Sequence, residues 1–122
     1  KKLKENIISN NLKLLSGMLP SFDMQIQKAE NRADLVSVNH RVTEFLASYF
    51  DIIFALNEMP HPGEKRMQSI CSKECSILPQ NFDENLNRLF EGMFRKDISP
   101  VIADMVDEIK KAVRETNSRA RQ

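Results

Sequence analysis

The fold is decided by residues 34–57, which read DLVSVNHRVTEFLASYFDIIFALN. No glycine or proline interrupts this stretch, and its apolar residues recur at the spacing of a helix with one buried stripe. Toward the C-terminal end the apolar side chains surround the helix, which is typical of a helix covered by several neighbours. The pattern predicts a central helix of about 24 residues, roughly 35 Å long. We expect it to begin at Asn31, because Asn31 and Asp34 resemble a weak capping box.

Five further segments show helical periodicity, and breaks that contain glycine or proline separate most of them. We expect helices at about residues 2–16, 22–29, 67–78, 82–94 and 100–116, the last with Ser99 as N-cap and Pro100 at its first position. The expected core stripe of the fifth helix comprises Phe82, Leu86, Leu89, Phe90, Met93 and Phe94. These elements predict an all-α fold, an antiparallel up-and-down bundle of four main helices plus shorter ones. Residues 1–116 are expected to form a single bundle domain, and the polar residues 117–122 a frayed tail.

Composition and charge narrow the classes of function. The chain has 122 residues, 41% of them hydrophobic, and its few Gly and Pro argue against a sheet protein with many turns. Eighteen basic against seventeen acidic residues give a net charge of +1, which argues against nucleic acid as a partner. The most apolar run, Phe45 to Leu56, is shorter than a bilayer span, so no membrane partner is expected. With only two cysteines we expect a reducing, cytoplasmic location, and with Lys1 at the start we expect a piece of a longer chain.

The most unusual local sequence follows the central helix, ALNEMPHPGEKR at residues 55–66. Two prolines restrict φ and a glycine permits close backbone approach, so this turn can be held rigidly. His61, Glu64, Lys65 and Arg66 are then expected near the N-terminus of the next helix, an end that favours anions such as phosphate. The alternative is a stiff interhelical turn whose charged side chains are only solvated.

The two stretches SYFDIIFALN at residues 48–57 and HPGEKR at residues 61–66 carry a resemblance. Together they resemble the helical C-terminal domain of a family of bacterial and archaeal nucleotidyltransferase-like proteins, in which a long helix ending in Asn is followed by an HPGEKR-type turn. The resemblance implies an upstream nucleotidyltransferase domain that holds divalent metal, Mg²⁺, with the helical domain closing over nucleoside triphosphate and acceptor. It implies no cofactor in this chain itself.

By the same resemblance, six residues of the turn form a substrate-binding site. Lys65 and Arg66 would contact nucleotide phosphates, and Asn57 and His61 would hydrogen-bond the substrate or position the loop. Glu64 would act as a base or pair with Lys65. The six residues are Asn57, His61, Gly63, Glu64, Lys65 and Arg66.

Other candidate centres lack the residues that their chemistry requires. Nucleotidyl transfer needs metal-holding carboxylates beside a Gly-Ser turn, and no Gly-Ser followed by Asp-x-Asp occurs, so this chain alone is not expected to be catalytic. Cys71 and Cys75 share a helical face but lack a second ligand pair, so we expect packed thiols and no metal. His40 lacks an Arg at the spacing of helical ribonucleases. Asp51, in the apolar part of the central helix, needs a partner.

Two hypotheses of function therefore stand. The first is an accessory, substrate-binding domain of a nucleotidyltransferase-like protein, and it predicts a basic pocket framed by Asn57, His61, Lys65 and Arg66. The second is a non-catalytic helical module for protein interaction, and it predicts a turn in solvent and an exposed apolar patch on one helix face.

Overall fold

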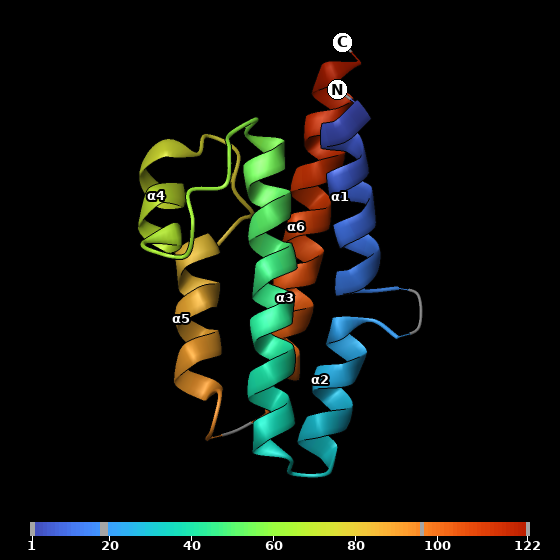
Figure 1. Cartoon of the computed structure of the whole chain (residues 1–122), viewed down its shortest axis with the longest axis vertical. Helices are drawn as coiled ribbons and strands as arrows, with labels where there is room; N and C mark the ends of the chain where they lie inside the picture. Colours follow the sequence, from blue (N-terminus) through green and yellow to red (C-terminus); the bar gives the residue numbers. More distant parts are fainter. Residues whose placement is uncertain (1, 18–19, 96, 122) are drawn as a thin grey trace.

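The computed structural model describes residues 2–17, 20–95 and 97–121, and within them it contains α-helices and no strand (Figure 1). The helices are α1 (Lys2–Leu15), α2 (Phe22–Asn31), α3 (Leu35–Leu56), α4 (Met67–Glu74), α5 (Phe82–Gly92) and α6 (Ser99–Ala120). The expected all-α class is therefore confirmed. An up-and-down bundle of four main helices is not confirmed, since α3 and α6 have 22 residues each whereas α1 has 14 and α5 has 11.

Helix α3 lies at the centre of the molecule, as its apolar circumference predicts (Figure 1). Helices α1 and α2 pack along one side of α3, and α4 packs near its C-terminal end on the other side. Helix α5 packs mainly against α6, which also contacts α2 and α3. None of the described helices combines the length and the apolar content that crossing a bilayer requires.

An aromatic cluster joins α3 to the start of α5. The Tyr49 ring stacks on Phe45, at 6.1 Å between centroids, and on Phe82, at 6.3 Å. Phe50 meets both Tyr49 and Phe82 edge-on, at 5.7 and 6.1 Å. Such arrangements are favoured by the ring quadrupoles and add to the burial of apolar surface. The first turn of α5 is therefore fixed to the middle of α3.

A compact link separates α2 from α3. Ala33 takes a left-handed φ of 55°, and the N–H groups of Ala33 and Asp34 donate to the carbonyls of Glu30 and Ala29. This is a Schellman motif, which ends a helix. The Asp34 carboxylate then accepts from the Ser37 N–H at 3.2 Å and caps α3. The expected start of the central helix at Asn31 is therefore wrong, because Asn31 still belongs to α2.

The carboxylate of Glu30 ties α2 to α6. It accepts from the Ile98 N–H at 2.9 Å and from the Ser99 hydroxyl at 3.0 Å, and so satisfies donors at the start of α6. Burial, followed by a hydrogen bond with Asp97, raises the pKa of Glu30. The same hydrogen bond lowers the pKa of Asp97. Helix α6 begins at Ser99 itself, with Ile98 rather than the expected Ser99 as N-cap.

Two expectations about the C-terminal half change. Phe90 and Phe94 of the expected α5 core stripe are 50% and 60% exposed, whereas Leu86 and Leu89 are fully buried. Helix α6 continues to Ala120, so residues 117–120 of the expected tail are helical, although exposed, and Gln122 lies outside the described residues.

Candidate functional site

The turn between α3 and α4 is exposed over residues 60–66. Gly63 has a φ of 93°, a value that side-chain-bearing residues rarely adopt, and beyond its two chain neighbours no atom lies within 4 Å of the position where its Cβ would be. Arg66 is the N-cap of α4 with a left-handed φ of 61°, and no side chain caps this helix end. The close backbone approach expected at Gly63 is therefore not found, and what this position requires of glycine is its positive φ.

Asn57 holds the turn against the segment that follows α4. Its Nδ2 donates to the carbonyls of Ile53 and Ile77, both at 2.8 Å, and its Oδ1 accepts from the Ile77 N–H at 2.9 Å. Both amide N–H donors are therefore in use. A ligand could therefore bind Asn57 only by donating to its Oδ1, which already accepts one hydrogen bond. The contacts of Asn57 are those of a residue that positions the turn.

His61 faces α3. Its ring packs edge-on against Phe54 at 5.4 Å, and its Nδ1 accepts from the Gly63 N–H at 3.0 Å. The neutral ring that makes this bond carries its proton on Nε2, which lies 3.8 Å from the Asp51 carboxylate. The Asp51 side chain is 45% exposed rather than buried, so the expected need for a protein partner does not arise.

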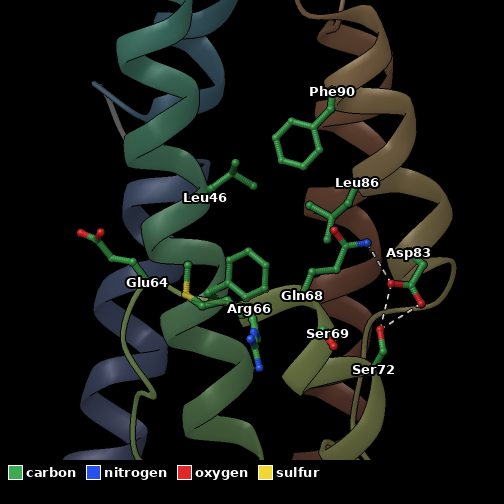
Figure 2. Close-up of a pocket in the computed structure, with 11 residues that line it drawn as sticks. Leu46, Glu64, Arg66, Gln68, Ser69, Ser72, Asp83, Leu86 and Phe90 are labelled. Atoms are coloured by element: carbon green, nitrogen blue, oxygen red, sulfur yellow. Dashed lines mark hydrogen bonds between the residues drawn. The ribbon is translucent and has the colours of Figure 1, made fainter.

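A pocket of about 590 Å³ lies beside the turn, between α3, α4 and α5 (Figure 2). Its volume is in the range of sites that hold small molecules. Most of its surface is apolar, from Leu46, Phe50, Met67, Leu86 and Phe90. The polar lining residues are Glu64, Arg66, Gln68, Ser69, Ser72 and Asp83. An apolar slot with a few polar groups at its edge is the usual form of a ligand site.

Hydrogen bonds fix the polar wall of this pocket. Asp83 Oδ1 accepts from Gln68 Nε2 at 2.9 Å and from the Ser72 hydroxyl at 2.9 Å, and Ser72 also lies 3.0 Å from Oδ2 (Figure 2). Gln68 and Ser72 are four residues apart on one face of α4. The network therefore joins α4 to the first turn of α5. Sequence reasoning missed these three residues, because isolated polar residues on helices resemble solvated ones.

The structure brings together only part of the site expected from the sequence. Of the six predicted residues, Glu64 and Arg66 line the pocket, whereas Asn57, His61, Gly63 and Lys65 do not. Figure 2 shows the Glu64 carboxylate pointing away from the pocket and Arg66 at its edge. The concavity predicted beside the turn exists, but it is mostly apolar and is framed by different residues. The turn itself lies in solvent.

The two cysteines are buried, as expected for thiols that pack as small hydrophobes. Cys75 Sγ lies 3.8 Å from the Met59 sulfur. Burial, with a contribution from Cys75, raises the pKa of Cys71 to about 12, so its thiol is protonated at neutral pH. Across residues 2–17, 20–95 and 97–121, no group of three His, Cys, Asp or Glu side chains is placed to hold a metal ion.

Comparisons of the chain with protein-family models, with curated proteins and with solved structures give no significant match.

Proposed function

We propose that the chain is a helical substrate-binding domain of a nucleotidyltransferase-like protein, in which the HPGEKR turn helps to bind a nucleoside triphosphate at a cleft shared with an upstream catalytic domain. The observation that carries the proposal is the pocket beside this turn, with Arg66 at its edge. In this scheme the upstream domain supplies the carboxylates and Mg²⁺, and the helical domain supplies binding energy.

The charges of the turn support a contact with phosphate. Lys65 and Arg66 are exposed, and neither forms an ion pair with another residue in the described part of the chain. Their charges are therefore available to a ligand. Charge-assisted hydrogen bonds from Lys or Arg to phosphate are about twice as strong as neutral ones.

The test is a double substitution, Lys65→Ala with Arg66→Ala, in the full-length protein. We expect the thermal midpoint to stay nearly unchanged, because exposed charges contribute little to stability. Calorimetric titration with ATP and MgCl₂ should show affinity reduced roughly ten- to hundredfold for each lost contact, or about 1.5–3 kcal/mol. The matched control is Lys111→Ala with Arg114→Ala, two exposed cations on α6. Equal affinity in both double variants would remove the phosphate role of the turn.

A second function, a protein-interaction module, is favoured by one observation. Phe90 of α5 and Phe94, two residues beyond the end of this helix, expose half or more of their surface. Exposed apolar surface of this kind marks interaction sites when it is contiguous. This function predicts that Phe94→Ala weakens a protein complex of the full-length chain, measured by analytical ultracentrifugation, whereas the double substitution in the turn leaves the complex intact.

A further inference from the structure

We infer that the pocket between α3 and α5 is a nucleobase subsite, in which a planar ring lies between Leu46 and Phe90 and presents an amino group to Asp83. This inference rests on the proposed function and names the part of the nucleotide that this chain would recognise. It is carried by the shape of the slot, by the acceptors at its far edge and by the position of Arg66.

The slot has the form of a stacking site. Leu46 of α3 and Phe90 of α5 face each other across it (Figure 2). The Phe90 ring is 50% exposed although its neighbours Leu86 and Leu89 are fully buried, so a wide aromatic face is left uncovered. Phe50, 5% exposed, lines the same slot. Nucleobases stack on aromatic side chains of this kind because every base has a planar π-face.

The polar edge of the slot selects for hydrogen-bond donors. Two donors, Gln68 Nε2 and the Ser72 hydroxyl, hold the Asp83 carboxylate, and its Oδ2 is approached only by the shared Ser72 hydroxyl and so keeps an acceptor position. Gln68 uses its Nε2 on Asp83, and its carbonyl oxygen forms no hydrogen bond with another described residue. Carboxylate and amide oxygens accept from the exocyclic amino groups of cytosine and adenine. Uracil offers a carbonyl oxygen at the corresponding position, so Asp83 would disfavour it.

The turn would contact the other end of the nucleotide, its phosphates. Arg66 lies at the edge of the slot and Asp83 at the other side, while the Glu64 carboxylate points away from the slot (Figure 2). A nucleotide bound with its base between Leu46 and Phe90 would therefore direct its phosphates toward Arg66. The negative charge of Asp83 would then meet the base edge rather than the phosphates.

The first experiment separates base from phosphate in the full-length protein, using adenosine, ATP with MgCl₂ and inorganic tripolyphosphate as calorimetric probes. Phe90→Ala should weaken adenosine and ATP at least tenfold and leave tripolyphosphate unchanged. Phe94→Ala is the matched control, since this exposed aromatic residue does not line the slot. Both positions are half or more exposed, so both variants should keep the wild-type thermal midpoint. Adenosine affinity that is equal in the wild type and Phe90→Ala, or no adenosine binding at all, would overturn the subsite.

A second experiment tests phosphate binding by the turn separately from base binding by the slot. Lys65→Ala with Arg66→Ala should weaken tripolyphosphate and ATP but leave adenosine unchanged. If that double variant binds tripolyphosphate as the wild type does while Phe90→Ala still loses adenosine, the turn has no phosphate role and the base subsite stands.

A third variant tests the amino edge. Asp83→Asn replaces one acceptor oxygen by an NH₂ donor of nearly the same size. The ratio of adenosine to uridine affinity should fall at least tenfold, because the new donor suits the uracil carbonyl. An unchanged ratio, with binding retained, would overturn the assignment of Asp83 to the base edge.

Discussion

The two sides of α3 differ in how completely they are covered. On one side α1 and α2 pack along the helix, and Leu15, Ile26 and Ala29 are fully buried there. On the other side the aromatic contacts of Phe82 hold the start of α5, while the rest of α5 packs against α6 and leaves the pocket between Leu46 and Phe90. The apolar residues of α3 are thus fully covered on one side, whereas on the other side some of them line a pocket. The side with the pocket also carries the turn, so the candidate site lies where packing is incomplete.

The largest expected effect comes from the buried surface of α3. Phe54 is 2% exposed, and its ring stacks on that of Phe50 with 6.3 Å between the centroids. Phe54→Ala should lower the free energy of unfolding by about 3–5 kcal/mol, because it removes buried apolar surface and leaves a cavity. Urea denaturation measures the change. Phe94→Ala, at a position that is 60% exposed, should stay within about 0.5 kcal/mol of the wild type. Similar losses in both variants would show that Phe54 is not part of the buried core.

Substitutions of Asn57 test how the segment after α4 is held against the end of α3. Asn57→Ala removes three hydrogen bonds and leaves the Ile77 N–H and carbonyl without this partner, which should cost about 1–3 kcal/mol. Hydrogen exchange should report faster exchange in α4 and around residue 77, with α1 and α2 unchanged. Asn57→Asp keeps an acceptor for the Ile77 N–H but places a carboxylate oxygen against the carbonyls of Ile53 and Ile77, so its loss should be at least as large. Uniformly faster exchange would mean that the molecule opens as one unit.

Substitutions of Gly63 test whether the stability of the fold depends on the backbone conformation of the turn. Gly63→Val should cost about 1–2 kcal/mol in thermal unfolding, because a branched side chain is strained at its φ of 93°. Gly63→Ala, the matched control, also carries a Cβ and should lose a similar amount, since beyond the two chain neighbours no atom lies within 4 Å of that Cβ. The substitutions of Lys65 and Arg66 should leave stability unchanged. A stable Gly63→Val variant would show that the turn relaxes to an ordinary conformation.

The smallest effect concerns Glu30 of α2. Its pKa is raised in the folded state above the ordinary 4.5, so the protonated form favours folding. The contribution is fully present below pH 4.5 and is lost as the pH rises through the folded-state value. Asp97 has the opposite sign, since its lowered pKa favours folding above 3.8 and that contribution is lost as the pH falls.

Glu30→Gln isolates this contribution. The amide can donate to Asp97 at every pH, so the pKa of Asp97 should stay low while the titration of Glu30 disappears. The stability advantage of the wild type should therefore shrink, by less than about 1 kcal/mol, between pH 4.5 and pH 7. Chemical denaturation at several pH values measures it. An advantage that grows with pH would contradict the raised pKa of Glu30.

Local sequence determined much of this molecule. The uninterrupted apolar pattern before Asn57 identified the central helix, because a helix buried on all sides needs apolar residues on all sides. The prolines and Gly63 identified the turn, because few residues tolerate its backbone angles. The start of α3 was misplaced because Ala33 occupies the left-handed position that glycine usually marks, and nothing in the sequence signals this.

Tertiary structure alone decided which apolar face became core and which polar residues met. Phe90 and Leu86 are equally apolar and one helical turn apart, yet only Leu86 is buried, because α5 docks on α6 rather than along α3. Gln68, Ser72 and Asp83 became a pocket wall only when α4 came to lie beside the first turn of α5. Periodicity states which residues share a face of a helix, and the neighbours that cover that face are set by the docking of the whole chain.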